Sequence, residues 1–323
     1  MTAPARPAAP SVIALPAPPA SGRRLDVGLV AAVVTAAAFG TSGPFAKSLL
    51  ETGWSSGAIV LLRVGIAAVV LLPLALVSLR GRWAAVRRHL GLVLSYGLVA
   101  VAGCQVAYFN AVQHLPVGVA LLLEYSGTVL VVLWVWVRTR RSPGRTTWVG
   151  IGVCVVGLAL VLDVVGHLRP DPVGVFWGLL AAVGLAVFFV GSASEADDLP
   201  PVGLAALGMV VGAVGLGVLG LLRVLPMTFA THDVVLRGAT WPWWLAIAEL
   251  SVIAAATAYL LGTFAARRLG STVASFVGLA EVLFAVLFAW VLLGELPRPV
   301  QLVGGLLVVG GVVAVRAGEL RRS

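Results

Sequence analysis

Residues 249–290, ELSVIAAATAYLLGTFAARRLGSTVASFVGLAEVLFAVLFAW, contain two apolar runs joined by the short basic turn Arg267-Arg268. A hydrocarbon core roughly 30 Å thick is crossed by about 20 apolar helical residues, so each run is long enough to span a membrane. Each run also carries one carboxylate, Glu249 in the first and Glu281 in the second. A charge at that depth costs roughly 2.5 kcal/mol or more, so both side chains are expected to face a protein-lined or watery interior.

The composition of the whole chain agrees with this interpretation. Apolar residues make up 60% of the 323 residues, charged residues only 11%, and the mean hydropathy is +1.06. A soluble domain needs a polar surface, so we expect an all-α polytopic protein in the lipid bilayer. A net charge of +9 would suggest nucleic acid in a soluble chain, but here the basic residues lie mainly at the ends of apolar runs, so no nucleic-acid partner is expected. Cys104 and Cys154 fall in different apolar runs and are interpreted as small packing residues.

Ten transmembrane helices are predicted, with edges good to a few residues. Residues 1–24, rich in Ala and Pro, are predicted to form a disordered cytoplasmic tail, and residues 317–323 a second cytoplasmic tail. The ten predicted spans are 25–46, 55–79, 90–112, 117–137, 146–163, 172–193, 202–223, 241–264, 271–292 and 299–316.

The basic residues also predict the orientation of these spans. With the N-terminus inside the cell, sixteen Lys and Arg residues fall in the tails and inner loops, five fall in outer loops, and Arg63 lies within a span. Loops on the cytoplasmic side carry the excess of Lys and Arg, so both termini are expected in the cytoplasm of a cell with this protein in its inner membrane.

A repeat divides the chain into two halves. When the sequence is shifted by 154 residues, 115–161 aligns with 269–315 without a gap, and thirteen positions match. The informative matches pair Trp136 with Trp290, Pro143 with Pro297, Gly150 with Gly304 and Gly157 with Gly311. Residues 25–163 and 172–316 then form repeats of five helices each. Because five is odd, the second repeat enters the membrane inverted, an arrangement typical of secondary transporters.

The two halves resemble a known family. The stretch AYFNAVQHLPVGVALLLEYSGTVL and the turn Gly294-Glu295-Leu296-Pro297 before the last helix are similar to the drug/metabolite transporter superfamily, most closely its EamA group. The resemblance implies movement of small metabolites across the inner membrane by alternating access. It also implies a cavity lined by the first four helices of each half, with the fifth and tenth helices peripheral. Thr128 stands where many relatives have a proline, so the same local kink is not assumed.

Four ionisable residues are predicted to lie deep in the membrane: Arg63, Glu124, Glu249 and Glu281. An isolated arginine in hydrocarbon is costly, so a carboxylate partner is expected, and Glu124 in the same half is the first choice. The alternative is that such a pair only fixes helix register and binds nothing. Glu295 and Asp163 fall near helix ends and are expected to be solvated.

Polar side chains are predicted to surround this charged layer. Together they could orient a zwitterion or another polar metabolite, whereas any one of them is more often an interhelical hydrogen bond than a ligand contact. They are Gln105, Tyr108 and Asn110 on the third span, Tyr125 and Ser126 on the fourth, and Thr257 and Tyr259 on the eighth. The glycines of the seventh span, including the Gly208–Gly212 pair, indicate close helix packing.

The sequence Gly40-Thr41-Ser42-Gly43-Pro44 interrupts the first span. A broken helix can expose backbone groups to a substrate, and the alternative is a helix end that frays before Pro44. The same residues fit the G-x-S-G of rhomboid-type intramembrane proteases. That enzyme hypothesis fails because all four histidines lie at span ends or in loops, away from any serine nucleophile. No HExxH, paired CxxC or P-loop is present, so no enzyme activity, metal or cofactor is expected.

The hypothesis that follows is a secondary transporter for a small-molecule substrate. Leu123-Glu124-Tyr125-Ser126-Gly127 loosely resembles the threonine/homoserine exporter branch of the family, which favours export of amino acids or related solutes. Glu281, set among Val, Leu, Phe and Ala, is the first candidate for coupling transport to protons. The alternatives are a multidrug or cationic compound exporter of the same fold and a membrane scaffold that transports nothing. A monomer is compatible with the sequence, and oligomeric state stays open.

Overall fold

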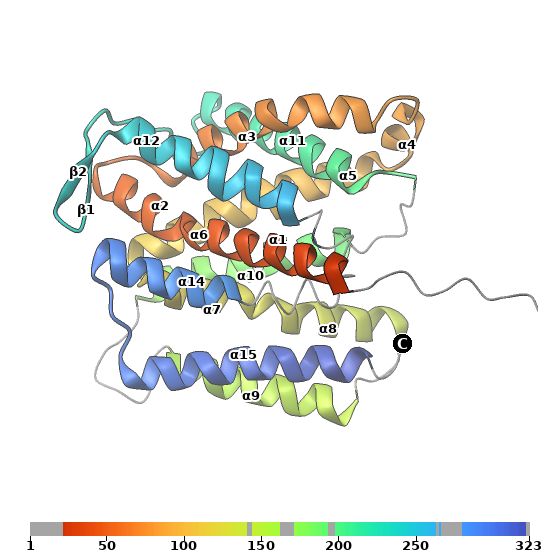
Figure 1. Ribbon diagram of the computed structural model, residues 1–323, viewed down its shortest axis with the longest axis vertical. Helices are drawn as coiled ribbons and strands as arrows, with labels where there is room; N and C mark the ends of the chain where they lie inside the picture. Colours follow the sequence, from red (N-terminus) through yellow and green to blue (C-terminus); the bar gives the residue numbers. More distant parts are fainter. Residues whose placement is uncertain are drawn as a thin grey trace, which may run out of the picture.

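In the computed structural model the chain forms one bundle of helices, most of them aligned along a common direction (Figure 1). The structure describes residues 22–140, 144–161, 171–192, 198–262, 265 and 280–320. Most of the first tail, the beginning of the predicted ninth span and the last three residues lie outside these ranges. Five helices are long and apolar enough to cross a membrane by length and composition: Val27–Glu51, Ser56–Ser78, Leu90–His114, Val202–Leu221 and Trp243–Gly262.

The helices fall where the hydropathy pattern predicts them. The first half contains α1 (Gly22–Gly40), α2 (Ser42–Glu51), α3 (Ser56–Ser78), α4 (Trp83–Arg88), α5 (Leu90–Ser95), η1 (Tyr96–Gly103), α6 (Cys104–His114), α7 (Val117–Tyr125), α8 (Gly127–Thr139) and α9 (Arg145–Val161). The second half contains α10 (Pro172–Ser192), α11 (Pro201–Leu221), α12 (Trp243–Ala248), η2 (Glu249–Thr257), α14 (Ala280–Phe288), η3 (Ala289–Leu293) and α15 (Pro299–Leu320).

The first predicted span is interrupted at one residue only. Thr41 separates α1 from α2, and its backbone angles, φ −71° and ψ −22°, remain close to helical. Pro44 is tolerated because it lies in the first turn of α2, where its missing N–H costs nothing. The helix therefore continues to Glu51 instead of fraying before Pro44, and the feature that the interruption offers to its neighbours is a pair of hydroxyl side chains.

The fourth predicted span is also interrupted. Ser126 separates α7 from α8, although no proline stands there. Its hydroxyl donates a hydrogen bond of 2.6 Å to the carbonyl of Leu123, which competes with the regular helix ladder. A methyl group on Gly127 would collide with the backbone of Ala182, so the glycine lets α8 approach α10 closely. The helix is therefore interrupted at Ser126 without the proline that many relatives have, although the backbone angles of Ser126, φ −60° and ψ −17°, remain helical.

Two π-helical segments occupy equivalent places in the two halves. η1 spans Tyr96–Gly103 in the third span and η2 spans Glu249–Thr257 in the eighth. A shift of 154 residues places the first on 250–257, so the offset of the sequence repeat also relates these two segments. π-Helical turns are rare in helices and are frequent at functional sites.

The pair α9 and α15 forms one edge of the bundle (Figure 1). A Cβ atom on Gly157 would lie 2.7 Å from the Gly304 carbonyl oxygen, and one on Gly311 would lie 2.7 Å from the Gly150 carbonyl oxygen. The 154-residue shift relates Gly150 to Gly304 and Gly157 to Gly311. The two contacts are therefore equivalent, with the roles of the two helices exchanged. Residue numbers rise along one helix as they fall along the other, so α9 and α15 run antiparallel.

The fold contains one feature that the all-α prediction missed. Strands β1 (Val234–Leu236) and β2 (Ala239–Trp241) form an antiparallel hairpin in which Val234 pairs with Trp241. Val234 and Leu236 are buried, and β1 packs against α2. We call the end of the bundle that carries this hairpin the hairpin end. The opposite end carries α4, the start of α1 and the end of α15 (Figure 1).

The hairpin end is tied together by contacts between the two halves. Lys47 of α2 forms an ion pair with Glu295, and the other oxygen of Glu295 accepts a hydrogen bond of 2.9 Å from the backbone N–H of Val117. The Ser55 N–H donates to the Thr228 carbonyl at 3.1 Å. The expectation that Glu295 is simply solvated is wrong, because its carboxylate caps the start of α7 and neutralises a lysine.

The glycines of the seventh span pack as predicted. A Cβ on Gly97 of η1 would lie 2.6 Å from the carbonyl oxygen of Gly208. A Cβ on Gly212 would lie 3.0 Å from the carbonyl oxygen of Gly97. α11 and η1 therefore approach through glycine backbones, as in other small-residue helix interfaces.

Candidate functional site

Arg63 occupies the centre of the buried polar residues. It lies in the first half of α3, and only 2% of its surface is exposed. One terminal nitrogen donates hydrogen bonds to Ser42 Oγ (2.6 Å) and Gln105 Oε1 (2.7 Å). The other donates to the backbone carbonyl of Ala254 at 2.9 Å. Its guanidinium also lies 5.4 Å from the ring centroid of Phe109, a cation–π contact. Arg63 thus connects α2, α6 and the π-helical segment η2.

The predicted ion pair between Arg63 and Glu124 is wrong. Glu124 of α7 is buried, but its Oε1 receives the thiol of Cys104 at 3.3 Å. Among the described residues Arg63 has no carboxylate within ion-pair distance, and all its hydrogen bonds go to neutral acceptors. Hydropathy places two residues at similar depth but does not fix which way each helix turns its side chain. Cys104 is consequently a donor to Glu124 in addition to being the packing residue that the sequence suggested.

Glu249 contacts the interruption of the first span. The hydroxyl oxygen of Thr41 lies within hydrogen-bond distance of both Oε1 of Glu249 and the carbonyl oxygen of Ala38, and its single proton is donated to one of them at a time. The second oxygen of Glu249, Oε2, is buried and has no hydrogen-bond partner in the described part of the chain. Unpaired buried carboxylate oxygens are costly, so this atom is a candidate for contact with a ligand, a proton or water.

Glu281 contacts the other half of the molecule. Its Oε2 accepts a hydrogen bond of 3.0 Å from the hydroxyl of Tyr125. Glu124 and Tyr125 are consecutive, so the end of α7 carries one carboxyl group, that of Glu124, and binds a second one, that of Glu281, through Tyr125. The polar residues therefore form two groups: Arg63 and Glu249 beside Thr41-Ser42, and Glu124 and Glu281 beside Cys104 and Tyr125.

The remaining predicted site residues have different roles. Asn110 donates one interhelical hydrogen bond to Ser56 Oγ and one to the Val106 carbonyl of its own helix, both at 2.8 Å, so its amide has no spare donor. Ser126 bonds within its own segment. Tyr108 is buried against Gly43, where a Cβ would lie 2.6 Å from its hydroxyl oxygen. The half-buried Tyr259 packs edge-on against Phe39 at 5.4 Å. Gln105 accepts a hydrogen bond from Arg63, so Gln105 and Tyr108 both lie close to groups of the α2 segment or its partner Arg63.

Several contributors were not among the predicted site residues. The side chains of Thr41 and Ser42, the thiol of Cys104 and the carbonyl of Ala254 all bind charged groups. The Gly40–Pro44 pattern did signal the first two, since it marked an interrupted helix. Nothing in the sequence signals the Ala254 carbonyl, because its position depends on the π-helical turn around it.

The serine that fits the protease motif has another partner. Ser42 accepts a hydrogen bond from Arg63, and His89 and His114 pair instead with Asp198 and Asp171 at opposite ends of the third span. Asp171 also accepts the N–H of Val173 at the start of α10. That backbone bond, aided by His114, holds the pKa of Asp171 below its ordinary value. In the described ranges no cluster of three or more His, Cys, Asp or Glu residues could hold a metal ion.

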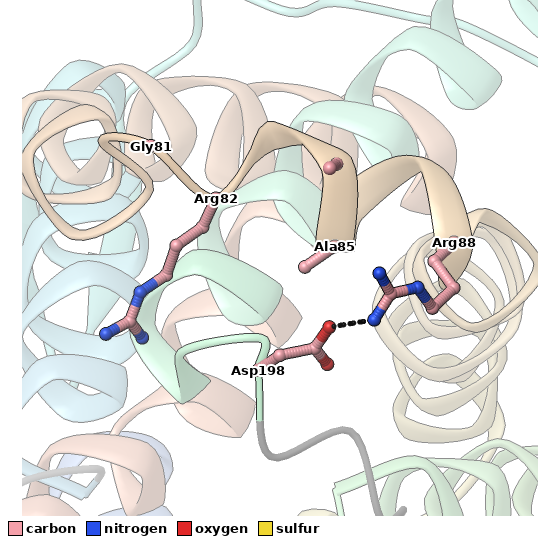
Figure 2. A pocket seen from close by; sticks show the side chains of 6 residues that line it. Gly81, Arg82, Ala85, Arg88 and Asp198 are labelled. Atoms are coloured by element: carbon pink, nitrogen blue, oxygen red, sulfur yellow. Dashed lines mark hydrogen bonds and ion pairs between the residues drawn. The ribbon is translucent and has the colours of Figure 1, made fainter.

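A surface pocket of about 400 Å³ lies at the end of the bundle that carries α4. Gly81, Arg82, Ala84, Ala85, Arg88 and Asp198 line it. Figure 2 shows Asp198 reaching Arg88, to which it is bonded at 2.9 Å, whereas Arg82 extends away from this pair. Asp198 also contacts His89 at 2.9 Å. These contacts fasten α4 to the start of α11, so the pocket is a junction between connecting segments and shares no residue with the buried charges.

Comparisons with known proteins agree with this architecture. The family model described as the EamA-like transporter family matches residues 26–163 and again 172–317. A probable terminal-alkyne amino-acid exporter of Streptantibioticus cattleyicolor is 29% identical over 241 residues, 73% of this chain and 76% of the relative. The threonine/homoserine exporter RhtA of Escherichia coli is 26% identical over 230 residues, 70% of each chain.

Two further matches extend over more of the chain. An uncharacterised transporter of Archaeoglobus fulgidus is 25% identical over 291 residues, 90% of this chain and 97% of that one. A protein of known crystal structure superposes on 94% of this chain and 100% of its own, with a TM-score of 0.52 and 19% sequence identity. At that identity the likeness concerns the fold alone.

Proposed function

This chain belongs to the EamA-like transporter family, and we propose that it exports amino acids or closely related solutes across the inner membrane by alternating access. The substrate class comes from the two curated relatives, whose names describe amino-acid exporters. One observation within this chain carries the proposal. Two consecutive residues bind side chains of opposite charge: Ser42 accepts a hydrogen bond from Arg63, and Thr41 contacts the carboxyl group of Glu249. An amino acid is a zwitterion and requires both.

We further propose ten spans arranged as two inverted repeats, residues 25–163 and 172–316, with both termini in the cytoplasm. Two contacts support this arrangement. The reciprocal Gly157–Gly304 and Gly311–Gly150 approaches are what a two-fold relation between antiparallel α9 and α15 requires. The π-helical segments η1 and η2 follow the same 154-residue offset. The start of α1 and the end of α15 lie at one end of the bundle, and the basic loops assign that end to the cytoplasm.

In this arrangement the hairpin end faces the outside of the cell. There the Lys47–Glu295 ion pair and the Ser55–Thr228 hydrogen bond join the halves, which supports a state that is closed toward the outside. Alternating access then requires these contacts to break when the site opens outward. The Glu281 carboxyl, bonded to Tyr125 across the halves, is the proposed coupling group for protons.

A second candidate substrate class is favoured by the charge balance. Three carboxyl groups, those of the buried Glu124 and of the half-buried Glu249 and Glu281, accompany one buried arginine among the described residues. An excess of carboxylates attracts cations, so export of organic cations by the same fold is the alternative.

The deciding experiment is efflux from vesicles that contain the purified protein. Vesicles would be loaded with L-threonine, L-homoserine, L-leucine or a cationic dye, with and without a pH gradient, and compared with protein-free vesicles. We expect protein-dependent efflux of at least one amino acid. Efflux of the dye alone would support the cation alternative, and no flux of any solute would favour a membrane scaffold.

A further inference from the structure

At the interruption of the first span, one basic and one acidic side chain bind the same short segment. Thr41 and Ser42 are consecutive, and their hydroxyls bind Glu249 and Arg63 respectively. The glycines on either side allow this closeness. A Cβ on Gly40 would lie 2.7 Å from Cβ of Phe284, and one on Gly43 would lie 2.6 Å from the hydroxyl of Tyr108. Segments from both halves of the chain therefore converge on two residues.

Arg63 lacks a counter-charge in the described part of the chain. A guanidinium group has five N–H donors, and three hydrogen bonds are formed, to Ser42, Gln105 and the Ala254 carbonyl. All three acceptors are neutral. An arginine that is 2% exposed retains its full positive charge, and a buried charge without an opposite charge is unfavourable. The site is therefore incomplete on its positive side.

The negative side is incomplete as well. Oε1 of Glu249 accepts the hydroxyl of Thr41, but its buried Oε2 has no partner among the described residues. The side chain lies at the start of η2, the segment whose Ala254 carbonyl binds Arg63. One π-helical segment thus carries an unsatisfied carboxylate oxygen and also anchors the unpaired arginine.

We infer that the Thr41-Ser42 segment is the subsite for the backbone groups of an α-amino acid, with the carboxylate on Arg63 and the ammonium on Oε2 of Glu249. This assignment rests on the proposed function and states which residue holds which end of the substrate. A zwitterion supplies both missing charges at once, whereas a simple anion or cation supplies only one. Thr41 and Ser42 position the two charged side chains.

The test is a cycle between variants and substrate analogues. Purified protein in nanodiscs would be titrated with L-threonine, with 3-hydroxybutanoate, which lacks the amino group, and with 1-amino-2-propanol, which lacks the carboxylate. We expect the wild type to bind L-threonine more tightly than either analogue. Glu249→Gln should weaken L-threonine binding by about 10- to 100-fold, as expected for a lost charged hydrogen bond, and leave 3-hydroxybutanoate unchanged.

Three further variants complete the cycle. Glu51→Gln changes an exposed carboxylate outside the site and should alter none of the three affinities. Arg63→Lys should weaken binding of the two ligands that have a carboxylate and spare the amine. Thr41→Val removes only the hydroxyl that holds Glu249, so it should show a smaller loss confined to the amino-bearing ligands even if the other variants fold poorly.

The outcomes separate this assignment from the proposed function. If Glu249→Gln weakens L-threonine and 3-hydroxybutanoate equally while the wild type still prefers the amino acid, Glu249 does not hold the ammonium and the assignment is overturned. If the wild type binds the amine as tightly as L-threonine, the carboxylate has no place at Arg63 and the assignment is again overturned. If the wild type binds none of the three, the assignment is overturned, whereas amino-acid transport is judged separately by the efflux of the amino-acid panel from vesicles.

Discussion

Tyr125 donates its hydroxyl to Oε2 of Glu281 at 3.0 Å, so a carboxyl group of the second half is held by the first half. The bond can form with the carboxylate or with the protonated acid, because the hydroxyl can donate to either. A change in the protonation of Glu281 would alter the strength of a contact between the two halves. For this reason Glu281 is the proposed link between proton movement and opening of the protein.

The first prediction concerns Glu281→Gln in vesicles with a pH gradient. Glutamine keeps the shape and still accepts the Tyr125 hydroxyl, but it cannot carry a proton. Accumulation driven by the gradient should fall to the level measured without one, while exchange of labelled for unlabelled substrate should continue. Tyr125→Phe is the matched control, since it removes the bond and keeps the titratable group, so its uphill transport should survive. Uphill transport by Glu281→Gln would exclude Glu281 as the coupling residue and make Glu249 the next candidate.

The second prediction concerns Arg63 and Glu124, which do not contact each other. Arg63→Met should destabilise the protein because Ser42, Gln105 and the Ala254 carbonyl lose their donor, each loss costing about 1–3 kcal/mol. Glu124→Gln should have a smaller effect, since it can still accept the Cys104 thiol. The thermal midpoint of the double variant in detergent should shift by the sum of the single shifts. A double variant more stable than Arg63→Met alone would contradict this and would support the hypothesis of an Arg63–Glu124 ion pair.

The outcome for Arg63 illustrates how far the sequence can predict the site. Depth along a helix follows from residue counting at 1.5 Å per residue, and this identified Arg63 and Glu124, which are buried, and Glu249 and Glu281, which are half-buried. Their partners depend on helix rotation, which one sequence does not specify. π-Helical segments such as η2 also change the direction, around the helix axis, in which every later side chain points. The composition of the sequence does not predict these segments.

The fold was more predictable than the site for a physical reason. Spans follow from apolar length, and the repeat follows from matched Trp, Pro and Gly positions, both of which are visible in the sequence. The hairpin at Val234–Trp241 was missed because its strands are three residues each and lie in a loop with mixed polarity. Glu295 was misjudged because the groups that bind its carboxylate, Lys47 and the N–H of Val117, are far away in sequence.

The third prediction tests the reciprocal packing of α9 and α15. Gly157→Ala and Gly311→Ala each place a methyl group 2.7 Å from a carbonyl oxygen on the facing helix. Each should destabilise the protein by about 1–3 kcal/mol, the usual cost of overpacking. Gly152→Ala and Gly310→Ala, with no neighbouring atom within 4 Å, are the controls and should be neutral or up to about 1 kcal/mol stabilising. Equal thermal midpoints for the two pairs would contradict the antiparallel glycine contact.

The fourth prediction concerns orientation in the membrane. Reporter domains fused after Arg140 and after Arg322 should both read as cytoplasmic, and one inserted near Thr231 should read as external. The Thr231 position belongs to the loop that leads into the hairpin. An alkaline phosphatase and a fluorescent protein give opposite signals at each site and serve as mutual controls. A cytoplasmic signal near Thr231 would refute the inverted repeat with its hairpin end outside.

The last prediction is that the Lys47–Glu295 contact opens during transport. The ion pair joins the first half to the turn before α15, and Glu295 also caps the first residue of α7 through Val117. Outward opening must separate these groups if the halves alternate. In the Lys47→Cys/Glu295→Cys variant, a short thiol cross-linker should therefore stop efflux, and cleavage of the linker should restore it.

Three features make that experiment decisive. Cys104 and Cys154 are buried, so the introduced thiols should react first. The two single-cysteine variants, treated with the same reagent, control for modification without a bridge. The double variant Lys47→Glu/Glu295→Lys should transport better than either single variant, because it restores an ion pair with the two charges exchanged. Undiminished efflux from fully cross-linked protein would mean that the hairpin end stays closed throughout the cycle, and substrate would then have to leave by another route between the helices.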